Sequence, residues 1–183
     1  YGFSELVKKY LGDYDNYNLY PDPHQQKLRK SLAEYVGTDY ERIVAGNGAD
    51  ELIDLLIRIF VGIGDEVIIP TPTFGMYSFG TEIVGGKVIN VPRDASYDID
   101  VEGIKESVTD KTKIIFLTSP NNPTGNLVST EDLAQLLKLD VIVVVDETYY
   151  EFCKVTHINL LSENANLVIL RTFSKWAGLA GLR

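Results

Sequence analysis

Short, continuous runs of apolar residues recur along the chain, and they limit its fold more than any other feature. The clearest runs lie in residues 113–117, 141–145 and 167–170, and each has strand character. They fall far short of the roughly 20 apolar residues that a membrane span needs. Strands that are apolar without alternation are typical of a parallel sheet covered on both faces. The sequence therefore predicts buried parallel strands.

Helical patterns separate these runs, so strands and helices alternate through the whole chain. We predict further strands over residues 42–45, 66–69 and 87–91. We predict helices over residues 5–11, 23–36, 51–60, 76–84, 101–108 and 131–138. This alternation predicts an α/β fold, a three-layer α/β/α sandwich with a mostly parallel sheet.

Local signals mark the ends of two of these helices. Asp22 is the expected N-cap of the helix over 23–36, with Pro23 at its first position and Gly37 after its last. Thr130 is the expected cap of the final helix.

The composition is that of an ordinary globular domain, and it excludes several functions. With 45% hydrophobic and 23% charged residues, the 183-residue chain can bury a core of its own. The net charge of −9 argues against general nucleic-acid binding, which depends on neutralising phosphates. Two histidines and one cysteine argue against a zinc site, and the single Cys153 indicates a reducing compartment, for which we expect the cytoplasm. We find no signal peptide, and the chain starts at Tyr1 without Met, so we expect the true start to be missing.

Polar and glycine-rich loops follow several of the predicted strands. Asp146 directly follows the strand over 141–145, where its carboxylate either takes part in chemistry or caps the next turn. Residues 46–50 lie between a predicted strand and a helix, an arrangement that presents backbone N–H groups to an anion, although many such turns bind nothing. Because the carboxyl ends of parallel strands meet at one edge of a sheet, we expect these loops to converge.

Two further loops carry side chains suited to a flat ligand. Phe74 follows the strand over 66–69 and either stacks on a ligand or packs in the core. Asn122 lies in the rigid loop over 119–125 and either donates its amide to a ligand oxygen or serves the turn alone.

Lys175 follows the last apolar run, where the backbone leaves the sheet. A lysine is most often a solvated surface residue, but catalytic groups are common in this position of α/β folds. Its neighbours Phe173 and Trp176 are expected to desolvate it, which favours use as a nucleophile.

Taken in chain order, these loops resemble the motifs of one enzyme family. The matching segments are residues 20–23 (YPDP), 46–51 (GNGADE), 72–77 (PTFGMY), 120–125 (PNNPTG), 146–149 (DETY) and 171–183 (RTFSKWAGLAGLR). Across nearly its whole length the chain is similar to the fold-type I pyridoxal-phosphate enzymes, specifically the class I/II aminotransferases. The wording of the first, third and last segments is most similar to the histidinol-phosphate branch.

The resemblance implies pyridoxal 5′-phosphate as the cofactor and a role for each matched residue. Lys175 would form a Schiff base with the cofactor and then act as general base and acid in moving a proton. Asp146 would pair with the pyridine nitrogen and keep it protonated. Tyr149 and Asn122 would hydrogen-bond the ring oxygen, and Phe74 would stack on the ring.

The same resemblance assigns the cofactor's phosphate and the quaternary structure. The phosphate would sit on the backbone N–H groups of Ala49 and Asp50. Ser174 and Arg183 would complete its site. Tyr20 would reach the phosphate of the partner subunit's cofactor, so the active unit would be a homodimer.

Members of the family continue well past Arg183, and this implies a domain division for the chain. We expect residues 1–20 to be an N-terminal arm or part of a small domain. We expect residues 21–183 to be the cofactor-binding large domain, incomplete because the chain is truncated. The C-terminal small domain, which carries most of the substrate-gripping residues, would be absent from this chain.

The resemblance implies a transaminase that moves an amino group between L-histidinol phosphate and 2-oxoglutarate, in histidine biosynthesis. Its partners would be a small amino donor and a 2-oxo acid, with no nucleic acid and no membrane. One alternative is a related enzyme with the same cofactor, either an aromatic amino acid aminotransferase or a decarboxylase of a phosphorylated amino acid. Another is an inactive, truncated chain that serves only as a structural or binding piece.

Overall fold

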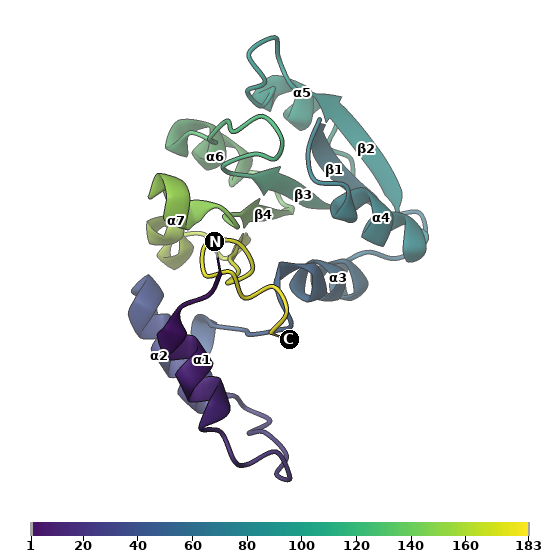
Figure 1. The fold of residues 1–183 in the computed structure, drawn as a ribbon. Helices are drawn as coiled ribbons and strands as arrows, with labels where there is room; N and C mark the ends of the chain where they lie inside the picture. The colour runs from purple at the N-terminus through teal and green to yellow at the C-terminus, as the bar shows by residue number, and fades with distance from the viewer. Residues whose placement is uncertain (1, 183) are drawn as a thin grey trace. The chain divides into compact units, whose positions relative to one another are not determined.

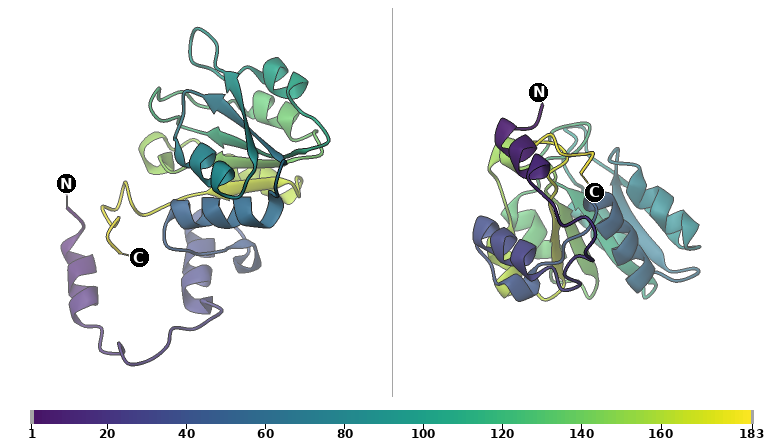
Figure 2. Two further views of the ribbon diagram at one scale, coloured as in Figure 1. Left: turned by 90° about the vertical axis from the view of Figure 1, so that its right-hand side faces the viewer. Right: turned by 60° about the horizontal axis from the view of Figure 1, so that its bottom comes forward.

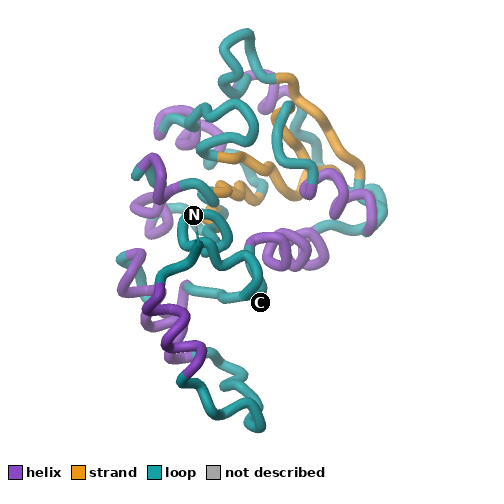
Figure 3. The backbone as a smooth tube through the Cα atoms, in the orientation of Figure 1, coloured by secondary structure: helices purple, strands orange, loops and turns teal. Residues whose placement is uncertain are grey.

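The computed structural model describes residues 2–182, which belong to two compact units. Residues 49–172 form the first, which we call the sheet unit. Residues 1–48 and 173–183 form the second, which we call the terminal unit. Among the described residues, every strand lies in the sheet unit, as the orange segments of Figure 3 show.

The sheet unit is built on a sheet of five parallel strands. These are β1 (Glu66–Thr71), β2 (Lys87–Pro92), β3 (Thr112–Thr118), β4 (Ile142–Asp146) and β5 (Leu167–Leu170). They are ordered β2-β1-β3-β4-β5, and every neighbouring pair is parallel (Figure 1). The predicted strands from residue 66 onward are confirmed within one or two residues at each end.

Helices cover both faces of this sheet, which confirms the three-layer prediction. The helices of the sheet unit are α3 (Ala49–Phe60), α4 (Met76–Ile83), α5 (Val101–Glu106), α6 (Thr130–Leu136), α7 (Tyr150–Cys153) and the 3₁₀ helix η2 (Ile158–Ser162). One core joins α3 and α4 to the sheet, and the other joins α5 and α6 to it. Figure 2 shows the layers of the sheet unit from two further sides.

The central strands are apolar without alternation because both of their faces are buried. On β3, Ile115 and Leu117 pack in the core beneath α5 and α6. Ile114 and Phe116 pack in the core beneath α3 and α4. Each of these four side chains is at most 1% exposed. The burial of both faces explains the sequence pattern from which the sheet was predicted.

The terminal unit contains two helices and a short turn. They are α1 (Glu5–Gly12), α2 (Gln26–Val36) and the 3₁₀ helix η1 (Tyr40–Arg42). Gly37 ends α2 in the left-handed conformation, with a φ of 78°, as its sequence position predicts. None of the helices in residues 2–182 is both long and apolar enough to cross a membrane.

The predicted strand over residues 42–45 is wrong. The segment enters through the 3₁₀ turn and then runs extended, without pairing to another strand among the described residues. The side chain of Arg29 takes the place of a strand partner, since its Nε donates to the carbonyl of Ile43 at 2.8 Å and its Nη2 to that of Tyr40 at 3.0 Å. Propensity for a strand is not enough when no neighbouring strand is available.

Two helix starts also differ from the prediction. The helix expected from Pro23 begins at Gln26, because Asp22 closes a turn ahead of it by accepting the Gln26 N–H at 2.9 Å. Ser129, rather than Thr130, caps α6. In both places a cap of the expected chemistry is present, but it lies at a neighbouring position.

We predict that Gly86→Ala destabilises the protein by about 2 kcal/mol through overpacking. A β-carbon at Gly86 would lie 2.7 Å from Cγ1 of Val61 and 3.1 Å from the carbonyl oxygen of Thr81. Gly75→Ala is the matched control, because no atom lies within 4 Å of its added β-carbon. Urea unfolding of the complete protein measures both variants, and equal midpoints for the two would contradict the prediction.

Candidate active site

The strand order reverses between β1 and β3, near the middle of the sheet. The chain passes from β1 outward to β2 on one side and then returns to place β3 on the other side of β1. In open parallel sheets, ligands bind at the carboxyl ends of the strands beside such a reversal. Asp146 ends β4, and the loops after β1, β3 and β4 carry the predicted residues Phe74, Asn122 and Tyr149. The topology therefore brings these four residues to one edge of the sheet.

Asp146 is the last residue of β4 and is only 3% exposed. Its Oδ1 accepts the N–H of Thr148 at 2.9 Å and the hydroxyl of Thr148 at 2.6 Å. Its Oδ2 lies 2.7 Å from the hydroxyl of Tyr77. Burial raises the pKa of Asp146 above its ordinary value, and the hydrogen bonds of Thr148 and Tyr77 oppose that rise. One oxygen therefore caps the turn after β4, while the other is held by a different element.

Tyr77, in the first turn of α4, is a site residue that the sequence analysis missed. Its ring is fully buried, stacks on Phe116 with centroids 4.6 Å apart, and meets Phe74 edge-on at 5.6 Å. Burial, and then the charge of Asp146, hold the pKa of Tyr77 well above its ordinary value. A tyrosine on the buried face of a helix needs a hydrogen-bond partner for its hydroxyl. The sequence analysis could have identified Tyr77 from this requirement.

The loop after β3 uses its two asparagines for different purposes. The amide nitrogen of the buried Asn121 donates to the carbonyl of Pro72 at 3.1 Å and to the hydroxyl of Thr124 at 2.8 Å. Its Oδ1 accepts the hydroxyl of Thr73 at 2.7 Å. The side chain of Asn122 is half-buried and makes no hydrogen bond within residues 2–182. Asn121 therefore fastens the loop, and the amide of Asn122 is available to a ligand.

The helix α3 begins at Ala49, at the end of the predicted glycine turn. The first N–H groups of a helix have no acceptor within it, and they form the positive end of its dipole. Those groups include the N–H of Ala49 and of Asp50, which the predicted anion site would use. After burial, which is the largest cause, the charge of Asp50 also raises the pKa of Asp146. The start of α3 thus lies close to the carboxyl end of β4.

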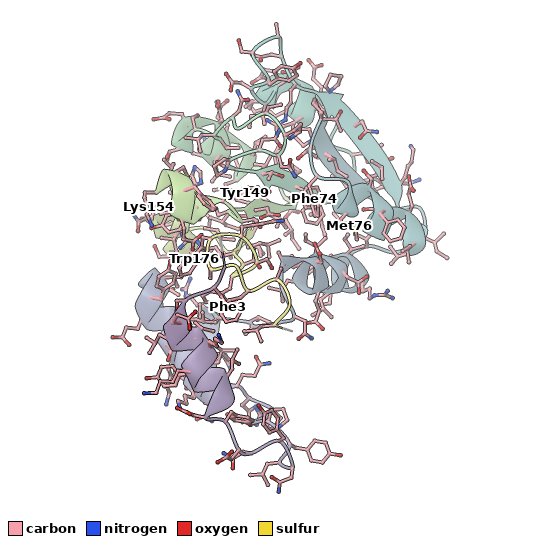
Figure 4. All side chains as sticks on the ribbon, in the orientation of Figure 1. Phe3, Phe74, Met76, Tyr149, Lys154 and Trp176 are labelled. Carbon is pink, nitrogen blue, oxygen red and sulfur yellow. The ribbon has the colours of Figure 1, made fainter. Side chains whose placement is uncertain are left out.

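Phe74 and Tyr149 flank the same edge from two different loops (Figure 4). Phe74 lies just before α4 and is half-buried, since one edge of its ring packs with Tyr77. Tyr149 precedes α7 and is also half-buried. Each of these aromatic rings therefore leaves part of its surface open to a ligand.

Lys175 belongs to the terminal unit and is exposed there. The rings of Phe173 and Trp176 pack against each other at 5.7 Å, and Trp176 stacks on Tyr35 at 6.2 Å. These two aromatic residues are themselves 41% and 40% exposed. The predicted desolvation of Lys175 by its neighbours is therefore not found within this unit.

Two other predicted site residues, Ser174 and Tyr20, also belong to the terminal unit. Ser174 is half-buried, and Tyr20 is fully exposed. Arg183 lies outside the described residues. Their roles toward a cofactor remain predictions.

Comparison with known proteins assigns the chain to a family. The family described as "Aminotransferase class I and II" matches residues 4–183. This chain belongs to that family. The Dehalococcoides mccartyi (strain ATCC BAA-2266 / KCTC 15142 / 195) protein named histidinol-phosphate aminotransferase is 53% identical to it over 183 residues, which are 100% of this chain and 51% of that protein. The chain thus spans about half the length of the curated relatives it matches.

Solved structures agree with this assignment. The histidinol-phosphate aminotransferase of Sinorhizobium meliloti in complex with pyridoxal-5′-phosphate has a TM-score of 0.87 and 28% identity, covering 100% of this chain and 51% of that one. The aromatic aminotransferase of Pyrococcus horikoshii OT3 has a TM-score of 0.88 and 27% identity, covering 100% of this chain and 55% of that one. The sheet unit therefore has the aminotransferase fold.

Membership of this family implies pyridoxal 5′-phosphate as the cofactor, and the side chains of the sheet unit fit that group. Its pyridine nitrogen needs a buried carboxyl group, which Asp146 could supply. Its flat ring needs an aromatic face, and Phe74 is at hand in the neighbouring loop. Its ring oxygen needs a donor, such as the uncommitted amide of Asn122. Its phosphate needs backbone N–H groups at a helix start, which α3 provides from Ala49 onward.

Glu147, directly after Asp146, has a structural role instead. It is completely buried, and its carboxylate accepts the hydroxyl of Thr156 at 2.8 Å, the backbone N–H of His157 at 2.8 Å and Nη2 of Arg171 at 2.9 Å. Burial alone would raise the pKa of Glu147, but the hydrogen bonds of His157, Thr156 and Arg171 hold it below its ordinary value of 4.5. This residue joins the end of β4 to the segment that follows β5.

We predict that Glu147→Gln lowers the free energy of unfolding by about 3 kcal/mol at neutral pH, because it leaves Arg171 without its buried partner. A depressed pKa contributes stability above the unfolded value of 4.5 and loses it as the pH falls through the folded value. The variant should therefore lose less stability than the wild type when the pH is lowered below about 4.5. Urea unfolding across pH measures both effects.

Glu102→Gln is the control for this prediction. Glu102 pairs with Lys105 at 2.6 Å, but its side chain is 75% exposed. We expect a change of less than about 1 kcal/mol. A loss at position 147 no larger than this would contradict a structural role for Glu147.

Proposed function

We propose that the complete protein is a pyridoxal-phosphate-dependent transaminase that moves an amino group between L-histidinol phosphate and 2-oxoglutarate, in histidine biosynthesis. The observation that carries the proposal is the buried carboxyl group of Asp146 at the carboxyl end of a central strand, beside the topological reversal. The family and the identity to proteins named histidinol-phosphate aminotransferase support it.

Residues of the sheet unit bind and orient the cofactor in this proposal. Bound pyridoxal phosphate supplies an electron-withdrawing ring that stabilises negative charge on the carbon beside an amino group. Asp146 holds the proton at the ring nitrogen, and Asn122 and Tyr149 hydrogen-bond the ring oxygen. Phe74 covers one face of the ring and excludes water from it.

Residues of the terminal unit complete the proposed site. Lys175 would hold the cofactor covalently and would move a proton to and from the reacting carbon. Ser174 and Arg183 would bind the phosphate, for which the sheet unit would supply the amides of Ala49 and Asp50.

The quaternary and domain arrangement forms part of the same proposal. Tyr20 reaches the phosphate in the partner subunit of a homodimer, and its full exposure is compatible with that role. Residues 1–20 act as an arm or as part of a small domain, and residues 21–183 belong to the large domain. A further domain of the complete protein grips the substrate. We place the enzyme in the cytoplasm.

The decisive experiment is an absorbance spectrum of the complete protein with pyridoxal phosphate, before and after borohydride, followed by peptide mass mapping. We expect a Schiff-base band that reduction removes, and a stable adduct on Lys175. A folded, complete protein that forms no adduct would sink the enzymatic proposal.

An aromatic aminotransferase is the second candidate, because a solved enzyme of that name shares the fold at 27% identity. Single turnovers of the loaded enzyme with L-histidinol phosphate and with L-tyrosine distinguish the two. We expect the phosphorylated substrate to react faster. Faster reaction of tyrosine would favour the second candidate, and release of CO₂ from a phosphorylated amino acid would indicate a decarboxylase.

We predict that Lys175→Ala lowers kcat by at least about 10³-fold, because the loss removes the proton-transfer group. Lys111→Ala is the matched control, since Lys111 is exposed at the opposite, amino end of β3. Steady-state kinetics on the complete protein measure both variants. Equal losses in the two would mean that the effect does not come from the active site.

A further inference from the structure

Three hydroxyl groups connect Asp146 to the loop after β3. The four successive oxygen–oxygen contacts are Asp146 Oδ2 to Tyr77 Oη at 2.7 Å, Tyr77 Oη to Thr118 Oγ1 at 2.9 Å, Thr118 Oγ1 to Thr73 Oγ1 at 3.0 Å and Thr73 Oγ1 to Asn121 Oδ1 at 2.7 Å. All five residues belong to the sheet unit. Thr118 and Asp146 are also direct partners in the register of β3 and β4.

The Asn121 end of this hydroxyl chain fixes its direction. The carbonyl of Pro72 can only accept a hydrogen bond, so the group that faces it at 3.1 Å is the amide nitrogen of Asn121. The oxygen of that amide therefore faces Thr73. Because an amide oxygen can only accept, Thr73 must donate its single proton to Asn121.

The hydroxyl chain is then one proton short when Asp146 is ionised. Each hydroxyl carries one proton, so Tyr77, Thr118 and Thr73 together supply three protons for the four contacts. Within residues 2–182, no further donor reaches these hydroxyl oxygens. A proton on Oδ2 of Asp146 fills every contact in one direction, from Asp146 through Tyr77, Thr118 and Thr73 to Asn121. The contact of Tyr77 with Thr118 is buried, and that of Thr118 with Thr73 is part-buried. A contact between two acceptors is costly in such surroundings, which favours this protonated arrangement.

We propose that Asp146 holds a proton on Oδ2 in the cofactor-free protein, and that Tyr77, Thr118 and Thr73 are the positioning residues that keep it there. The use of this proton rests on the proposed function. When a ring nitrogen binds beside Asp146, the O–H bond breaks and an N–H bond forms. The resulting carboxylate then accepts the hydroxyl of Tyr77.

The surroundings of Asp146 act in both directions on its proton. Burial favours the protonated form, and so does the nearby negative charge of Asp50 on α3. The two donors of Thr148 favour the ionised form. Arg93, which follows β2, is the cation that interacts electrostatically with the Tyr77 end of the hydroxyl chain. The proton count along the hydroxyl chain decides between these opposing influences.

The test is Thr118→Val in the complete, cofactor-free protein. It removes the middle hydroxyl and leaves two contacts, Thr73 to Asn121 and Tyr77 to Asp146, with one proton for each while Asp146 is ionised. The proton affinity of Asp146 should therefore fall about tenfold. If Thr118 only made the site more polar, its loss would raise that affinity instead. The measurement is a ¹³C NMR titration of the aspartate carboxyl carbons, with Asp146→Asn used for assignment.

Three further variants keep the test decisive. Thr118→Ser retains the hydroxyl and should restore the wild-type titration. Thr81→Val is the matched control, because Thr81 is also buried but bonds the backbone of Tyr77 at 2.7 Å, outside the hydroxyl chain. Thr73→Val leaves two contacts, Asp146 to Tyr77 and Tyr77 to Thr118, with one hydroxyl proton for each. It therefore replaces Thr118→Val if that variant fails to fold. The proposal would be overturned if Asp146 is ionised at neutral pH in the wild type. It would also be overturned if neither Thr118→Val nor Thr73→Val changes the titration of Asp146.

A second measurement follows the proton to the cofactor. Pyridoxal phosphate is titrated calorimetrically in two buffers of different ionisation enthalpy, at the pH midway between the Asp146 titrations of the wild type and of Thr118→Val. We expect the variant to take up about half a proton more from solvent per cofactor bound than the wild type, which is the largest difference that a tenfold change in proton affinity allows. Equal uptake would overturn the transfer. Failure to bind the cofactor would reject the proposed function and leave the NMR result standing.

Discussion

Asp146 lies where β4 leaves the sheet, and its carboxyl group is held between Thr148 on one oxygen and Tyr77 on the other. The other features of the sheet edge depend on this contact. Tyr77 can reach Asp146 only because its ring is stacked on Phe116, in the core beneath α4. The packing of the core thus fixes the geometry of a polar group at the candidate site.

Asp146 and its neighbour Glu147 show how two adjacent carboxyl groups can differ. Burial dominates at Asp146 and raises its pKa, whereas hydrogen bonds dominate at Glu147 and lower its pKa. The difference comes from the partners, because Asp146 meets hydroxyl groups and one amide, while Glu147 also meets the guanidinium of Arg171. Asp146 can therefore change its protonation state, while Glu147 keeps the charge on which the local structure depends.

The sheet could be predicted from the sequence because strands that are buried on both faces are apolar at every position, as in residues 141–145. The strand over 42–45 could not be judged this way, since a side chain from α2 occupies the carbonyls that a strand would have used. Phe74 and Asn122 could be predicted as candidate site residues because they lie in loops that follow strands. Tyr77 was missed because hydroxyl partners depend on which loops meet in space, and spacing along the chain does not reveal this.

The bond from Arg171 to Glu147 spans 24 residues of sequence and crosses from β4 to the residue after β5. During synthesis, a nascent chain that has not yet emerged through residue 171 can bury Glu147 only without its cation, which is costly. We expect the carboxyl end of β4 to remain unfolded in the ribosome-bound chain until β5 docks beside it. The candidate site at the carboxyl end of β4 would then reach its final structure only after β5 is in place.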